Sequence, residues 1–144
     1  MVLGLAFAIG VVAGLRSFTA PAAVCWAAHL GWLRLTGFVE TTAALYISSA
    51  LALMELVLDK TPWIGARTKP GPLIFRLFTG GLSGAALGAW MGAAAGILGA
   101  LAGTYGGYYA RHWMVANLKV PDIAVALVED ALAVGSALLI VSRF

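Results

Sequence analysis

The chain has 144 residues, of which 62% are hydrophobic and only 10% are charged. Soluble domains are about half apolar and about a quarter charged, and a soluble protein of this size keeps too much surface to bury so many apolar side chains. The nine lysines and arginines give a formal net charge of +3. They are scattered at the ends of apolar stretches and form no basic stripe, which excludes a nucleic-acid partner. Composition therefore predicts an integral membrane protein.

The first apolar block, residues 2–15, is followed by Arg16, and a second apolar block covers residues 17–33. The first block lacks the basic start of a signal peptide, so we expect it in the mature protein. It makes only about 21 Å of helix, whereas the hydrocarbon of a bilayer is about 30 Å thick. Two arrangements follow: a short span, or a re-entrant pair of half-helices that meet inside the membrane at Arg16-Ser17.

A third block, residues 41–58, is just long enough for one span, and a loop rich in proline and glycine follows it. The apolar run 73–110 would be nearly two bilayers long as one helix, so we expect it to fold back near residues 90–92. The last block, residues 122–142, fits one span. The expected fold is all-α and polytopic, with about six helical segments in one domain: a first transmembrane half 1–58, a cytoplasmic loop 59–72 and a second half 73–144.

Basic residues divide unevenly between the two sides of such a bundle. Only Arg34 and Arg143 fall on the side of the chain termini. The opposite side holds most of the others, including Arg67, Lys69 and Arg76, which we interpret as loop charges. Because basic loops stay in the cytoplasm, this bias predicts a bacterial inner (cytoplasmic) membrane protein with both termini outside the cytoplasm. Trp32, Trp63, Trp90 and Trp113 fall near predicted helix ends, as interfacial tryptophans do.

The third segments of the two halves resemble each other. Residues 50–55 read Ala-Leu-Ala-Leu-Met-Glu, and residues 124–129 read Ala-Val-Ala-Leu-Val-Glu. In each case an aspartate follows the glutamate within four residues. With three segments per half, the second half enters from the opposite face, so the halves would form an inverted repeat. That arrangement is typical of transporters, and it is also a simple outcome of gene duplication.

Glycines recur every third or fourth residue through the long apolar run, as in a glycine zipper. This spacing places small residues on one helical face, where they allow close backbone approach in lipid. The face could pack within the chain or form a dimer seam. Its members are Gly80, Gly84, Gly88, Gly92, Gly96, Gly99, Gly103 and Gly107.

A few polar residues interrupt the apolar blocks, and ionisable residues inside a membrane are functional candidates by default. We expect them to form a polar intramembrane centre, in which Arg16 faces Glu55, Glu129 or Asp130. Adjacent helical residues point about 100° apart, so Glu129 and Asp130 should not both face one partner. The centre could handle a proton, a cation or an anionic substrate, or it could be a buried ion pair that only fixes the two halves. Its expected members are Arg16, Ser17, Glu55, Glu129 and Asp130.

Nothing in the sequence argues for catalysis. It has no Walker motif, no G-x-S-x-G, no H-E-x-x-H and no cysteine pair, so we predict no catalytic residue, no metal site and no cofactor. The single cysteine, Cys25, is interpreted as a packing residue. His29 lies in an apolar segment and could bind a metal or pigment, but we expect a hydrogen-bonded core histidine.

Several stretches together resemble a known family over nearly the whole chain. They are residues 14–22 (Gly-Leu-Arg-Ser-Phe-Thr-Ala-Pro-Ala), 26–29 (Trp-Ala-Ala-His), 55–62 (Glu-Leu-Val-Leu-Asp-Lys-Thr-Pro), 67–68 (Arg-Thr) and 126–133 (Ala-Leu-Val-Glu-Asp-Ala-Leu-Ala). The chain is similar in these stretches to the small bacterial membrane proteins of the domain of unknown function 4126 family. The resemblance implies a small bacterial multi-pass membrane protein. It implies no catalytic or binding residue, because the family's activity is uncharacterised.

Three classes of function fit these features. The first is a small transporter-like or channel-like protein with the polar centre as its site. The alternative is a non-catalytic accessory or structural subunit of a larger membrane complex, with the glycine faces against its partners. A membrane enzyme that acts on lipid is third. The expected partners are membrane lipids and either further copies of the chain or other membrane subunits.

Overall fold

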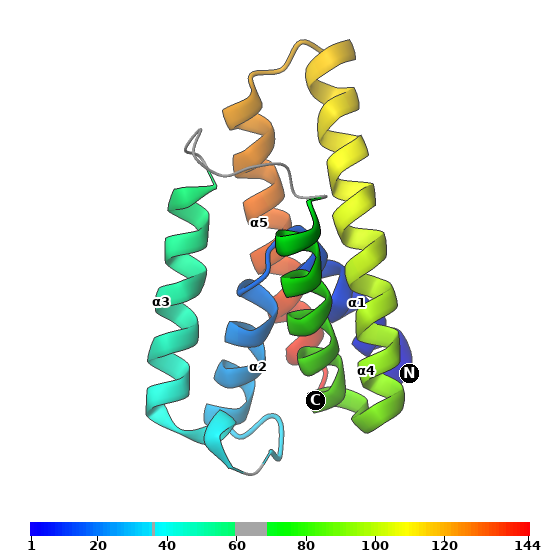
Figure 1. The fold of residues 1–144 in the computed structure, drawn as a ribbon. Coiled ribbons are helices and arrows are strands. Elements are labelled where there is room, and N and C mark those ends of the chain that lie inside the picture. The colour runs from blue at the N-terminus through cyan, green and yellow to red at the C-terminus, as the bar shows by residue number, and fades with distance from the viewer. Residues whose placement is uncertain (36, 60–68) are drawn as a thin grey trace.

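A computed structural model describes residues 1–35, 37–59 and 69–144 (Figure 1). Within these ranges the chain is helical and contains no strand, which confirms the expected all-α class. Two of the helices, α4 and α5, are long and apolar enough to cross a membrane. The expectations for Trp63 and Arg67 lie outside the described residues. The elements are α1 (Val2–Leu15), α2 (Thr19–His29), the short 3₁₀ helix η1 (Phe38–Glu40), α3 (Thr42–Leu58), α4 (Pro70–Asn117) and α5 (Asp122–Val141).

Helices α1 and α2 are short and meet at a break. Arg16 ends α1 with an extended backbone (φ −142°, ψ 113°), and α2 begins at Thr19. Pro21 is the third residue of α2, where the missing N–H has no intrahelical partner to lose. Figure 1 shows α1 and α2 running in opposite directions, with their junction partway along the bundle.

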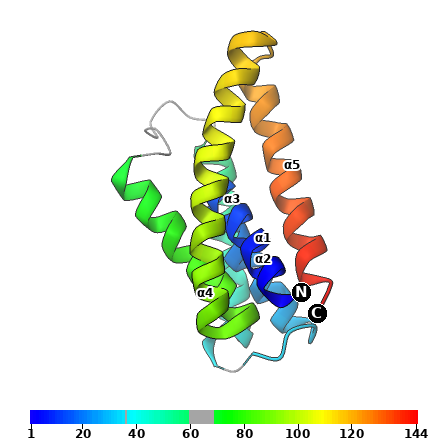
Figure 2. The ribbon, with the colours of Figure 1, turned by 90° about the vertical axis from the view of Figure 1, so that its right-hand side faces the viewer.

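Helix α4 folds back on itself. Gly88 and Ala89 have non-helical backbone angles, and Ala89 has a positive φ of 52°. The helix is thus two arms, residues 70–87 and 90–117, which Figure 2 shows side by side near the turn. The fold-back therefore lies just before the expected residues 90–92. A second correction concerns the loop 59–72: α4 already begins at Pro70, because proline suits the first helical turn.

The glycine face packs inside the chain. A Cβ atom at Gly84 would clash with the carbonyl oxygen of Gly92, and one at Gly96 would clash with that of Gly80, so these glycines let the two arms of α4 touch. A Cβ atom at Gly103 would clash with the backbone of Val11 in α1. Helix α1 therefore lies directly against the α4 hairpin. Two of the expected members behave differently: Gly88 belongs to the turn, where a Cβ would meet only side chains, and Gly107 lines a small cavity.

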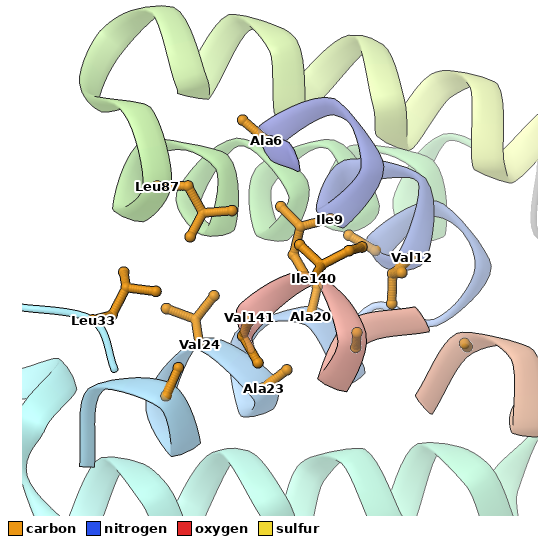
Figure 3. Packing of buried hydrophobic residues seen from close by; sticks show 14 residues of the cluster. Ala6, Ile9, Val12, Ala20, Ala23, Val24, Leu33, Leu87, Ile140 and Val141 are labelled. Atoms are coloured by element: carbon orange, nitrogen blue, oxygen red, sulfur yellow. The ribbon is translucent and has the colours of Figure 1, made fainter. Parts of the chain in front are cut away.

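The apolar core joins α1, α2, α5 and the first arm of α4, near the end of the bundle where both chain termini lie (Figures 1 and 3). Ile9 and Val141 are among its largest fully buried side chains. Helix α3 stands at the outside and packs mainly against α2. Its outward face is apolar and open, with Tyr46 69% and Val57 68% exposed.

Candidate functional site

Arg16 is the centre of a buried group of charges. It lies in the break between α1 and α2, and 0% of its surface is exposed. Its Nη1 donates to the carboxylate of Asp59, at the end of α3, and its Nη2 donates to that of Asp130, in α5. A buried guanidinium is tolerated only with such partners, because desolvation of an unpaired charge is very costly. The Arg16 side chain therefore links the break between α1 and α2 to α3 and α5.

Glu55 binds the free backbone N–H groups at the beginning of α2. Its carboxylate oxygens accept hydrogen bonds from the backbone N–H groups of Ser17 (2.7 Å) and Phe18 (2.9 Å). The first N–H groups of a helix have no partner within it, and a negative charge at that end also complements the helix dipole. Ser17 therefore contributes its backbone amide to the site. Of the three carboxylates expected to face Arg16, Asp130 does so, whereas Glu55 binds the backbone at the start of α2.

Arg76 binds the free backbone carbonyl oxygens at the end of α1. Its interpretation as a loop charge was therefore wrong. It lies in the first arm of α4 and is 4% exposed. Its Nη1 donates to the carbonyl oxygens of Gly14 and Leu15, the latter at 3.0 Å, and the hydroxyl of Thr104 also donates to the Gly14 oxygen at 3.2 Å. The last carbonyls of a helix lack intrahelical partners, and a cation is favourable there. The glycine packing draws the arm against α1, so Arg76 is buried there.

Arg111 connects Glu129 to the surface. Its Nε and Nη2 donate to the carboxylate of Asp122 at 2.8 and 2.7 Å, and its Nη1 lies 3.7 Å from Oε2 of Glu129. The same Nη1 lies 3.9 Å from the Asp59 oxygen that binds Arg16. Side-chain exposure falls from 64% at Asp122 to 0% at Arg16 along this series. Charged groups therefore lead from the solvent-exposed end into the core.

These contacts define what we call the charged cluster: Arg16, Glu55, Asp59, Arg111, Glu129 and Asp130. The structure brings all the expected members of the polar centre to this region. Glu129 and Asp130 face different cations, as the turn of about 100° between adjacent helical residues requires. Sequence reasoning missed Asp59, Arg76 and Arg111 as partners. The repeated pattern of a glutamate followed by an aspartate was a signal for Asp59, whereas Arg76 and Arg111 looked like flanking charges.

A cavity of about 140 Å³ lies beside the charged cluster, between α4 and α5. Leu15, Met114 and Leu132 are among its apolar walls, and Arg111 and Glu129 also line it. The space is large enough for a few water molecules next to the Glu129 carboxylate.

Other candidate residues lie away from the charged cluster. His29 is exposed in the last turn of α2, so the expectation of a core histidine was wrong. Cys25 is buried and free, in keeping with a packing role. Among the described residues, no three histidine, cysteine, aspartate or glutamate side chains are grouped so that they could hold a metal ion.

No protein-family model, no curated protein and no solved structure matches this chain. The resemblance to the domain of unknown function 4126 family therefore stays a prediction. Function has to be inferred from the geometry of the charged cluster and of the helices that hold it.

Proposed function

We propose that this chain is a small polytopic protein of a bacterial cytoplasmic membrane and that the charged cluster is a site for a proton or a small ion that it transports. The membrane location is supported by the open apolar faces of α3 and α5, where Leu53, Val57, Leu132 and Leu139 are exposed. Contiguous apolar surface of this extent mostly marks an interaction site or aggregates in water, and it costs nothing in lipid.

The directions of the helices support two inverted halves. Helices α1 and α3 run away from the end that holds the termini, and α2 runs toward it (Figure 1). In the second half, the first arm of α4 and α5 run toward that end, and the second arm of α4 runs away from it (Figures 1 and 2). This is the alternation that six segments in two inverted halves require. The halves differ in length, because α1 and α2 are much shorter than the arms of α4.

The break between α1 and α2 is the observation that carries the proposal of transport. In transporters with broken helices, the N-terminal ends of half-helices face anions, while the C-terminal carbonyls face cations. Here the protein's own Glu55 and Arg76 occupy these two positions. Asp130 lies 11 residues from the end of α5 at Val141, about 16 Å along the helix, which would be near the middle of a bilayer. Internal charges that neutralise a broken helix at that depth can exchange partners with an ion.

Ion flux into liposomes tests this proposal. The purified protein is reconstituted in liposomes that contain a dye sensitive to H⁺, Na⁺ or K⁺, and the corresponding ion is driven by an imposed gradient. We expect flux above that of protein-free vesicles for one of these ions, and a fall of at least tenfold in the Glu129→Gln variant. Glu129 is chosen because it lines the cavity beside the charged cluster, and glutamine keeps the size of its side chain while removing the charge. The control is Glu40→Gln, an exposed residue of η1.

Two results would contradict the proposal. The parent protein could carry none of the three ions, or Glu129→Gln and Glu40→Gln could carry them equally well. In either case the charged cluster would be a structural ion-pair network that fixes the helices.

The second candidate function is an accessory subunit of a membrane complex, and the position of α3 favours it. Helix α3 stands at the outside, packs mainly against α2 and presents a broad apolar face with Tyr46 and Val57. Such a face suits a neighbouring transmembrane subunit. Purification in mild detergent separates the two functions, because stable co-purification with other chains indicates a subunit and a lone homodimer favours transport.

A further inference from the structure

Helix α3 is anchored to the rest of the protein by its first half. The buried residues of α3, which are Ala44, Leu45 and Ser48, all lie in that half. Ala44 and Leu45 form a small apolar cluster with Cys25 of α2. The hydroxyl of Thr41 accepts a hydrogen bond from the Ala44 N–H at 3.2 Å and so caps the beginning of the helix. The first half of α3 therefore has a fixed place against α2.

The outer half of α3, residues 49–58, stands away from the bundle. A groove of about 270 Å³ with almost entirely apolar walls separates it from α2 and α5. Ala52 and Leu53 line the groove on the side of α3, while Ala23 of α2 and Leu138 of α5 line the other walls. In a membrane, apolar faces gain little by meeting each other, because the lipid tails are as apolar as the side chains. Apolar contact therefore does little to hold this half in place.

Two carboxylates near the end of α3 fasten its outer half to the charged cluster. Glu55 accepts hydrogen bonds from the backbone N–H groups of Ser17 and Phe18, at 2.7 and 2.9 Å. Asp59 accepts a hydrogen bond from the guanidinium of Arg16. Hydrogen bonds to an ionised group are roughly twice as strong as neutral ones. These bonds therefore fix the outer half of α3 beside the break between α1 and α2.

Arg16 keeps a carboxylate partner even when α3 moves away. Its Nη2 donates to Asp130 in α5, and this bond does not involve α3. Because a buried guanidinium without any carboxylate would be very costly, Asp130 makes a released state of α3 accessible. The loss of the Glu55 bonds to the beginning of α2 keeps that state less populated than the one in the structure.

We propose that α3 is a gate on the charged cluster: its first half is the hinge, and Glu55 and Asp59 are the latch. From Ser48 to Asp59 the helix is about 16 Å long, so a rotation of about 20° moves its charged end by about 6 Å. When the latch releases, the charged cluster opens into the groove, whose walls include Leu56, the neighbour of Glu55. The role as a gate rests on the proposed ion transport, whereas the movement itself does not.

Distances between spin labels, measured by pulsed electron paramagnetic resonance in detergent, test the movement. Cys25 is replaced by alanine, so that only introduced cysteines carry labels. One pair, Val57→Cys with Leu127→Cys, joins the charged ends of α3 and α5, and a second pair, Tyr46→Cys with Leu139→Cys, joins their opposite ends. All four positions are exposed. We expect two distances for the first pair, which differ by up to about 6 Å, and one distance for the second.

The Glu55→Gln variant weakens the latch. Its amide keeps one acceptor oxygen and loses the charge, so we expect the ratio of released to latched protein to rise at least fivefold in the Val57–Leu127 distances. The control is Glu40→Gln, which makes the same chemical change at an exposed position of η1 and should leave the ratio unchanged. The Tyr46–Leu139 distance should stay the same in both variants.

Two results would overturn this proposal. Val57–Leu127 distances that do not change in Glu55→Gln would show that α3 is fixed. Equal broadening of both distances would show that the whole helix loosens and does not pivot. The movement and the transport can be separated, because movement in a protein that carries no ion would confirm the hinge and latch and refute the proposed transport. Ion flux without movement would keep the transport and refute the gate.

Discussion

Removal of the Arg16 side chain tests how the fold depends on its buried charges. In the Arg16→Met variant, a side chain of similar length replaces the guanidinium, and the carboxylates of Asp59 and Asp130 lose their shared cation. Removing one partner of a buried ion pair costs about 3–5 kcal/mol, and here one change affects two carboxylates. Since most domains are stable by only about 5–15 kcal/mol, we expect a loss of at least about 4 kcal/mol in the free energy of unfolding.

The buried Cys25 supplies the assay. It is the only cysteine in the chain and is 8% exposed, so a thiol-reactive dye should label it only when α2 opens. The rate or extent of labelling is measured against temperature or denaturant in the same detergent for parent and variant. The control is Arg34→Met, because Arg34 is exposed and substitutions at such surface positions change stability by about 0.5 kcal/mol or less.

A compensating variant separates charge from packing. Arg16→Met combined with Asp59→Asn and Asp130→Asn removes all three charges, and we expect it to regain much of the lost stability. If Arg16→Met alone is destabilised by less than about 1 kcal/mol, the cation cannot be the buried link that the structure shows.

Three further predictions concern packing, capping and topology. In thermal unfolding, Gly96→Ala should destabilise the protein by about 1–3 kcal/mol, because its Cβ would meet the backbone of the other arm of α4. Gly106→Ala should stabilise the protein by up to about 1 kcal/mol, because the space around Gly106 is open and alanine favours the helix. Glu55→Gln should cost about 1 kcal/mol in the same measurement, because a neutral amide caps α2 less well than a carboxylate; an unchanged midpoint would argue against the cap. In whole cells, a membrane-impermeant thiol reagent should label the Ser142→Cys variant directly and the Asn117→Cys variant only after the cells are permeabilised. The reverse pattern would show that the protein has the opposite orientation in the membrane.

Much of the secondary structure could be predicted from the sequence, for plain physical reasons. Apolar blocks bounded by charges and prolines predict helices, and the run 73–110 had to fold back because one straight helix would be far too long. Glycines every fourth residue predict close packing, and the structure places Gly80, Gly84, Gly92 and Gly96 at the contact between the arms of α4. The candidate residues Arg16, Glu55 and Asp130 could be chosen because charges are rare in such a chain.

The partners of those charges could not be predicted from the sequence, because they depend on how each helix is rotated about its axis. Arg16 and Asp130 are 114 residues apart, and Arg16 and Asp59 are 43 apart. Composition shows that a charge needs a partner, but only the rotation and tilt of packed helices decide which carboxylate reaches it. The partners of Arg76 also depend on how the helices pack, because in the sequence alone Arg76 looks like a loop charge.

The sequence by itself determined the helical class, the positions of most helices, the fold-back of α4 and the small set of charges that need burial or pairing. Those properties depend on local composition and on the fixed rise of a helix per residue. Only the tertiary structure decided that Glu55 and Arg76 neutralise the two ends of the break at Arg16, and that Asp59 and Asp130 share the Arg16 guanidinium. These features arise where separate helices meet, at distances set by the glycine and alanine contacts between them.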